Sequence, residues 1–131
     1  MRLVVDLQAC QSKDNRQRGI GNYSRHLVNG LIDTNPGHEI VVALNGNNIE
    51  GVAECRAFLS DILDDSAIYV WDCPVEVKAA DPANNARRRV AERMREHFIA
   101  NLRPDVLLIT SLFEGLDDTC VTSVHETNLP V

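Results

Sequence analysis

The stretch Ile40-Val41-Val42-Ala43-Leu44 is an unbroken apolar run that ends at Asn45-Gly46. A strand with one face in water alternates apolar and polar side chains, whereas a strand covered on both faces is apolar throughout. This run therefore predicts a strand buried between two layers, which is the environment of a parallel sheet.

The segments on either side of this run alternate between strand and helix patterns. Further strands are predicted at 3–5, 67–71 and 106–109, and helices at 19–34, 52–63 and 81–102. This alternation implies right-handed crossovers. We therefore expect an α/β fold with a Rossmann-like, doubly wound, mainly parallel sheet, formed by one domain over residues 1–131.

The third helix has a strong start signal, because Asp81 is a good N-cap and Pro82 suits the first helical position. Apolar side chains then recur every three or four residues and predict its buried face: Ala83, Ala86, Val90, Met94, Phe98 and Leu102. The run 87–89, three consecutive arginines, is expected on a solvated face of this helix, with a basic interface patch as the alternative.

The polar, aperiodic residues 8–18 predict a long loop before the first helix. Gly19 and Gly21 open that helix, and a helix N-terminus attracts phosphate through its unpaired N–H groups and its dipole. Cations on the same loop add to this attraction: Lys13, Arg16 and Arg18. The alternative is that the glycines only allow a tight entry into the helix and the cations are solvated.

A dinucleotide site is excluded, although Gly19-x-Gly21-x-x-Ser24 resembles its fingerprint. That fingerprint follows the first strand at once, and an acid ends the second strand to hold a ribose. Here a long loop intervenes and the second strand ends at Asn45. No phosphate-binding P-loop and no serine nucleophile elbow are present either.

Composition and charge exclude several classes of partner. The net charge is −6 and aromatic residues make up 5% of the chain. Nucleic acid is therefore not an expected partner. No apolar run approaches the roughly 20 residues of a membrane span. Asp6 interrupts any signal-peptide pattern, so we expect a cytoplasmic protein.

The four cysteines, Cys10, Cys55, Cys73 and Cys120, are far apart in the sequence. They form no Cys-x-x-Cys pair, and no histidine lies at zinc-ligand spacing. We expect reduced thiols in or near the core and no metal site.

Polar residues beyond the fourth strand are further candidates. Glu114 is placed to bind a sugar hydroxyl or to act as a base, the alternative being a solvated loop carboxylate. The chain closes with Leu129-Pro130-Val131, which resembles the approach to another strand. We therefore expect the domain to be incomplete at this point.

A second class of function is a stand-alone flavodoxin-like binding or signalling module. A receiver-type module needs an acidic cluster at the first strand and a phosphorylatable aspartate after the third. Asp72 does follow the third strand, but Asp6 stands alone.

Several motifs together resemble the N-terminal domain of bacterial family 4 retaining glycosyltransferases, especially mannosyltransferase-like enzymes of O-antigen and capsule assembly. They span the chain in this order: 5–11 (VDLQACQ), 18–24 (RGIGNYS), 43–46 (ALNG), 81–84 (DPAN), 103–106 (RPDV) and 111–115 (SLFEG). No single motif is decisive, and their order carries the resemblance.

This resemblance implies a GT-B architecture with an acceptor-side N-terminal domain and a missing C-terminal domain that holds the nucleotide-sugar. The donor diphosphate is expected at Gly19 and Gly21 with Arg18. The acceptor, a glycan or a lipid-linked glycan, is expected at Ser111, Phe113 and Glu114. Catalytic residues are expected beyond Val131, so the fragment is expected to be inactive.

The resemblance also implies a retaining transfer without a cofactor or a dedicated metal, the nucleotide-sugar being a substrate. It leaves open a peripheral membrane association of the full-length enzyme and a dimer of the fragment.

Overall fold

The computed structural model describes residues 1–13, 19–34, 36–125, 128 and 130–131. Within them lies a four-stranded, wholly parallel sheet in the order β3-β2-β1-β4. Its strands are β1 (Arg2–Asp6), β2 (Glu39–Asn45), β3 (Ile68–Trp71) and β4 (Val106–Ile109). The predicted α/β fold with a Rossmann-like sheet is confirmed.

The two central strands are buried on both faces, as the unbroken apolar run predicts. Val4 of β1 lies opposite Val41 of β2 and Leu107 of β4. All three side chains are fully buried. Because both faces are covered, polar side chains on either face of these strands would be buried, so the strands lack the polar alternation of a half-exposed strand.

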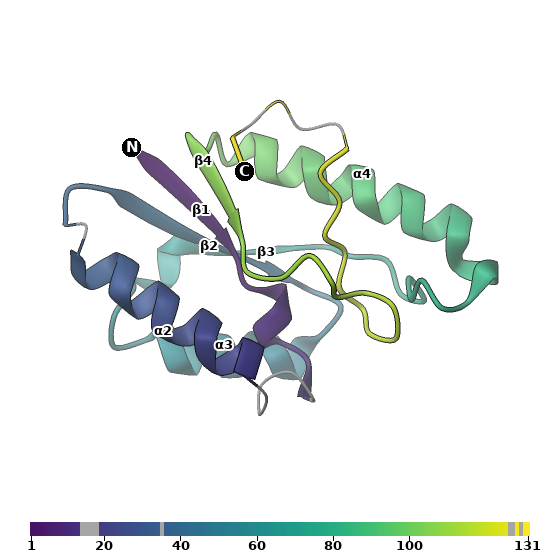
Figure 1. Ribbon diagram of the computed structural model, residues 1–131, viewed down its shortest axis with the longest axis horizontal. Helices are drawn as coiled ribbons and strands as arrows, with labels where there is room; N and C mark the ends of the chain where they lie inside the picture. Colours follow the sequence, from purple (N-terminus) through teal and green to yellow (C-terminus); the bar gives the residue numbers. More distant parts are fainter. Residues whose placement is uncertain (14–18, 35, 126–127, 129) are drawn as a thin grey trace.

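Helices cover the two faces of the sheet (Figure 1). One side carries α2 (Gly19–Thr34) and α3 (Ile49–Leu59), and the other carries α4 (Asn85–Asn101). Val5 and Val42 pack in the cluster that includes Val28 of α2, while Val4 and Val41 pack in the cluster that includes Ile99 of α4. The sheet is therefore doubly wound.

The start of α4 differs in detail from the prediction. Asp81 accepts a hydrogen bond from the backbone N–H of Ala83 at 2.9 Å, as an N-cap does. The turn that it caps is a short 3₁₀ helix, η3 (Pro82–Asn84), and α4 itself begins at Asn85. Asp81 thus caps the turn that leads into the helix.

The predicted buried face of α4 is confirmed at Leu102, which is buried, and at Phe98, which packs against the core, but it is wrong over the preceding turns. The helix buries Ala91, Arg95 and Ile99, whereas Val90 is 53% exposed and Met94 is 41% exposed. The physical reason is Arg95, which is fully buried and therefore occupies a core position with a charged side chain. A prediction that counts only apolar residues leaves Arg95 out, and it therefore assigns the wrong side of the helix to the core.

The predicted loop at 8–18 is also wrong at its beginning. Residues 8–10 form a 3₁₀ helix, η1 (Gln8–Cys10), and both Gln8 and Gln11 are buried. The remainder of that loop, residues 14–18, lies outside the described residues.

The start of α3 is fixed against η1 by side-chain hydrogen bonds. Asn48 caps α3 by accepting from the N–H of Gly51 at 2.8 Å, and it donates to the carbonyl oxygen of Gln11 at 2.7 Å. A Cβ at Gly51 would lie 2.5 Å from that same carbonyl oxygen. The predicted helix over 52–63 therefore begins three residues earlier, at Ile49, and ends at Leu59.

No helix in the described part of the chain combines the length and the apolar character needed to cross a bilayer.

Candidate functional site

The candidate site lies at the carboxyl edge of the sheet, where ligands bind in open α/β folds. The segments that follow the strands meet there: η1 after β1, the turn at 46–48 after β2, and the loop 110–118 after β4. Figure 1 shows α2 beginning at the same edge, beyond η1.

A buried ion pair stands at the carboxyl end of β1. The Nε atom of Arg95 donates to Oδ2 of Asp6 at 3.0 Å, and a terminal guanidinium nitrogen donates to the same oxygen. Both side chains are almost completely removed from solvent. A buried pair of this kind is sensitive to the loss of either partner, because the remaining charge is uncompensated.

Gln8 extends this pair into a polar network. Its side-chain Nε2 donates to Asp6, and its Oε1 accepts from Nδ2 of Asn45 at 3.0 Å. The same amide group exchanges two hydrogen bonds with the backbone of Val121, at 2.8 Å and 3.0 Å. Asn45 also donates to the carbonyl oxygen of Thr119 at 2.9 Å.

The network holds residues 119–123 across the carboxyl edge. Arg95 completes it by donating to the carbonyl oxygen of Ser123 at 2.6 Å. The polar side chains that directly follow β1 and β2 are therefore engaged with the chain's own backbone. Sequence analysis missed this network, although its signal was present: Asp6, Gln8 and Asn45 each come at or just after the end of a buried strand.

Asp6 has a structural partner that bears on the signalling alternative. Its carboxylate is held by Arg95 and Gln8 and is buried. Asp72 is exposed. A receiver-type module needs an accessible acidic cluster at this position. In the described structure Asp6 is instead buried in an ion pair with Arg95.

The solvated face expected for 87–89 is wrong for Arg88. Its guanidinium donates to three backbone carbonyl oxygens, those of Val77 at 2.7 Å, Gly115 at 3.1 Å and Cys120 at 3.3 Å. The cause is the path of the segments at 77–79 and 115–120, which bring these three carbonyl oxygens to the Arg88 side chain. Arg87 conforms to the expectation, since it makes an exposed ion pair with Glu76.

Arg88 and Gly115 fix the base of the loop after β4. Gly115 has a φ of +99°, and a Cβ there would lie 2.4 Å from the carbonyl oxygen of Cys120. Glycine is the residue that tolerates both conditions. The loop is further tied by backbone hydrogen bonds from Ala79 to Gly115 and from Ala80 to Leu116, each 2.9 Å.

The structure brings the predicted acceptor residues together in this loop. The hydroxyl of Ser111 donates to Oε1 of Glu114 at 3.0 Å and accepts from the N–H of Phe113 at 3.4 Å. Ser111 is buried and Glu114 is half-buried. The Phe113 side chain is 93% exposed.

The predicted phosphate residues lie at the other side of the edge, at the start of α2. Gly19 is exposed and a Cβ added to it would meet no atom within 4 Å. Gly21 is buried, and its carbonyl oxygen lies 3.8 Å from the thiol sulfur of Cys10. Arg16 and Arg18 lie outside the described residues, and the phosphate assignment stays a prediction.

All four cysteines are buried and none forms a disulfide, as the sequence predicts. Burial raises the pKa of the Cys10 thiol, and it raises the pKa of Cys73 to about 11. Burial, reinforced by the nearby Asp118 carboxylate, raises the pKa of Cys120 even more strongly. The thiols of Cys10, Cys73 and Cys120 are therefore protonated at neutral pH.

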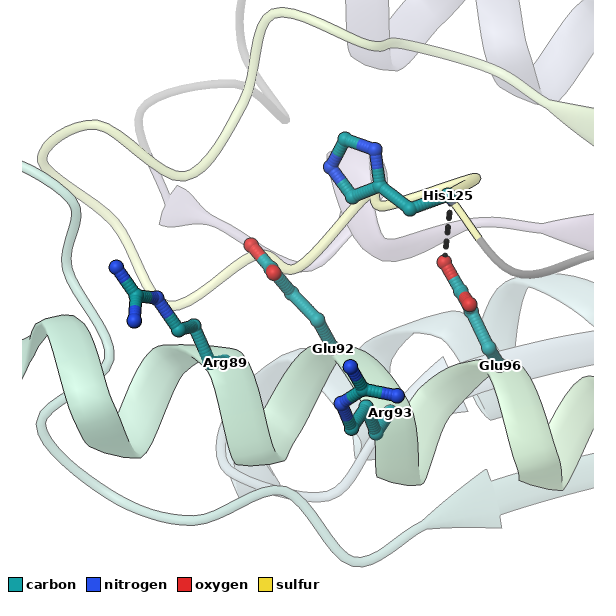
Figure 2. A pocket seen from close by; sticks show the side chains of 5 residues that line it. All are labelled: Arg89, Glu92, Arg93, Glu96 and His125. Atoms are coloured by element: carbon teal, nitrogen blue, oxygen red, sulfur yellow. Dashed lines mark hydrogen bonds between the residues drawn. The ribbon is translucent and has the colours of Figure 1, made fainter.

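A small cavity of about 100 Å³ lies beside α4, and none of the predicted site residues lines it (Figure 2). It is lined by ionisable side chains of both signs: Arg89, Glu92, Arg93, Glu96 and His125. Glu96 accepts a hydrogen bond from the backbone N–H of His125 at 2.8 Å. The cavity carries its own counter-charges, so its electrostatics favour neither anions nor cations.

Comparison with known proteins identifies distant relatives. The chain is 26% identical over 131 residues to the serotype-specific mannosyltransferase WbdA of Escherichia coli, covering 99% of this chain and 16% of that protein. Two further WbdA sequences of Escherichia coli are each 25% identical over 105 residues, covering 79% of this chain and 13% of theirs. The chain thus spans about a sixth or less of their length.

No protein-family model matches the chain. No solved structure shows significant similarity to it. The similarity to the mannosyltransferases establishes a distant relationship to glycosyltransferases, in agreement with the family resemblance in the sequence.

Proposed function

We propose that this chain is the acceptor-side domain of a retaining glycosyltransferase of GT-B architecture. The enzyme would move a hexose, mannose in the simplest case, from a nucleotide-sugar to a glycan or a lipid-linked glycan. The observation that carries the proposal is the similarity to mannosyltransferases over almost the whole chain. The Rossmann-like sheet supports it, because such a sheet presents loops and helix N-termini at one edge.

The donor diphosphate would lie against the start of α2. No acidic residue occurs in the first turn of this helix, and Gly19 leaves its backbone open to an approaching anion. The N–H groups of the first turn and the helix dipole would stabilise the charge of the leaving nucleotide, and Arg18 would add to this attraction. In the proposed reaction the nucleotide-sugar is a substrate, and no cofactor takes part.

The acceptor would bind at the loop that follows β4, through Ser111, Phe113 and Glu114. The remaining donor contacts and the catalytic residues would come from a further domain of a longer, cytoplasmic protein, as the greater length of the relatives suggests. Residues 1–131 alone would then be inactive.

The donor site is tested by Gly19→Asp in the complete protein. An aspartate at this exposed position has room and suits a helix N-terminus, so the fold is retained. Its charge would repel the diphosphate, and we expect the KM for the nucleotide-sugar to rise about tenfold, which corresponds to about 1.4 kcal/mol.

Gly19→Ala is the matched control, because it adds a side chain without charge. Its KM should stay within about twofold of the wild-type value. An unchanged KM in the aspartate variant would remove the phosphate role from the start of α2.

A further inference from the structure

The carboxyl edge exposes large apolar side chains, although such side chains are usually buried in a soluble domain. Six of them lie in segments that follow a strand or begin a helix at this edge: Ile20, Tyr23, Ile49, Leu112, Phe113 and Leu116. Half of these belong to the loop after β4, where Phe113 is the most exposed large apolar residue described.

Hydrogen bonds fix the backbone on both sides of Phe113. The Ser111 hydroxyl accepts from the N–H of Phe113 and donates to the carboxylate of Glu114, while the guanidinium of Arg88 donates to the carbonyl oxygen of Gly115. The loop is thereby tied on both sides of the aromatic ring. An aromatic ring displayed by an anchored loop loses little conformational entropy when a ligand covers it.

The charge around this ring favours a neutral ligand. The loop 110–118, which carries the ring, contains three acidic residues and no lysine or arginine: Glu114, Asp117 and Asp118. The guanidinium of Arg88 under the loop is engaged with three carbonyl oxygens, and its side chain is only 16% exposed. An anionic headgroup or diphosphate would therefore meet repulsion here.

We propose that Phe113 is a stacking platform for a neutral pyranose ring of the acceptor glycan. The axial C–H groups of a sugar would lie on the electron-rich face of the phenyl ring. The carboxylate of Glu114, held close by through Ser111, would accept a hydrogen bond from a ring hydroxyl. This inference rests on the proposed function, and it assigns the loop to the sugar part of the acceptor.

Titration of the ¹⁵N-labelled 131-residue chain with a manno-oligosaccharide tests the platform. We expect amide shifts that saturate in the millimolar range and map to residues 111–118. Phe113→Ala should weaken binding at least tenfold, while Phe113→Trp retains it. Val90→Ala, which truncates an exposed apolar side chain on α4, is the matched control and should leave the Kd unchanged.

Two results would overturn the platform. One is an absence of shifts at 50 mM oligosaccharide, or an equal Kd for Phe113→Ala and wild type. The other is flotation of the chain with vesicles of anionic phospholipid that is lost in Phe113→Ala, which would make the loop a lipid-binding element. Sugar transfer by the complete protein is measured separately, so the platform can fail while the transferase assignment stands.

Discussion

Arg95 is a fully buried cation on α4, whose other buried residues, Ala91 and Ile99, are apolar. It neutralises Asp6 at the end of β1 and also binds the carbonyl oxygen of Ser123. One side chain therefore connects the central strand, α4 and the segment that crosses the carboxyl edge.

We predict that Arg95→Ala lowers the free energy of unfolding by about 3–5 kcal/mol, because Asp6 is left as a buried, unpaired charge. Arg87→Ala on the same helix should cost less than about 1 kcal/mol, since its pair with Glu76 is exposed. Urea unfolding followed by circular dichroism measures both. Equal losses in the two variants would show that the Asp6–Arg95 pair is not a major source of stability.

The raised pKa of the buried Cys73 thiol leads to a second prediction, on the pH dependence of stability. The pKa of Cys73 is about 11 in the folded protein against an ordinary value of 9.0. Between these values the unfolded chain releases the proton and the folded chain keeps it, so stability falls as the pH rises. The loss should reach at most about 1.4 kcal/mol per pH unit for each such thiol.

Cys73→Ala provides the comparison, because it removes one of the titrating groups. Its urea midpoint should fall less steeply than that of the wild type between pH 8 and pH 10.5. Identical slopes for the two proteins would contradict the raised pKa.

Among the elements, the strands were predictable and the orientation of α4 was not. The run at 40–44 indicated its own environment, because a strand covered on both faces tolerates few polar side chains. On α4 the buried face contains Arg95, whose partner Asp6 lies 89 residues away in the sequence. A local pattern carries no information about such a partner, so Val90 and Met94 were placed in the core incorrectly.

In the candidate site, too, some residues could be proposed from the sequence and others could not. Ser111 and Glu114 were chosen as candidates because they follow a strand, and their role in binding an acceptor stays a prediction. The network at Gln8 and Asn45 was missed although both residues stand at or just after the end of a strand, because their partners are backbone groups at 119–121, far along the chain. Burial of an amide side chain depends on that tertiary contact, which the sequence does not display.

The corrected face of α4 can be tested directly. Met94→Gln should change the free energy of unfolding by no more than about 0.5 kcal/mol, because Met94 is substantially exposed. Ile99→Ala should cost about 2–5 kcal/mol, since Ile99 is buried in the cluster with Val4 and Val41. Urea unfolding measures both. A larger loss of unfolding free energy for Met94→Gln than for Ile99→Ala would support the buried face predicted from the sequence.

At the scale of the whole molecule, the two proposed ligand positions both belong to segments at the carboxyl edge of the sheet, the start of α2 and the loop at 111–116. The segment 119–123 is fixed at the same edge, to the ends of β1 and β2, by Gln8, Asn45 and Arg95. One network of buried polar side chains therefore joins the two central strands, α4 and the segment that follows the loop.

The central claim is that this domain belongs to a sugar-transferring enzyme, and transfer itself tests it most directly. Incorporation of labelled mannose from a nucleotide-sugar into a glycan acceptor should be measured with the protein made from the complete reading frame. We predict incorporation by that protein, and none by residues 1–131 alone or by a version that lacks them. Absence of transfer to any glycan acceptor by the complete protein, or undiminished transfer after removal of residues 1–131, would contradict the assignment.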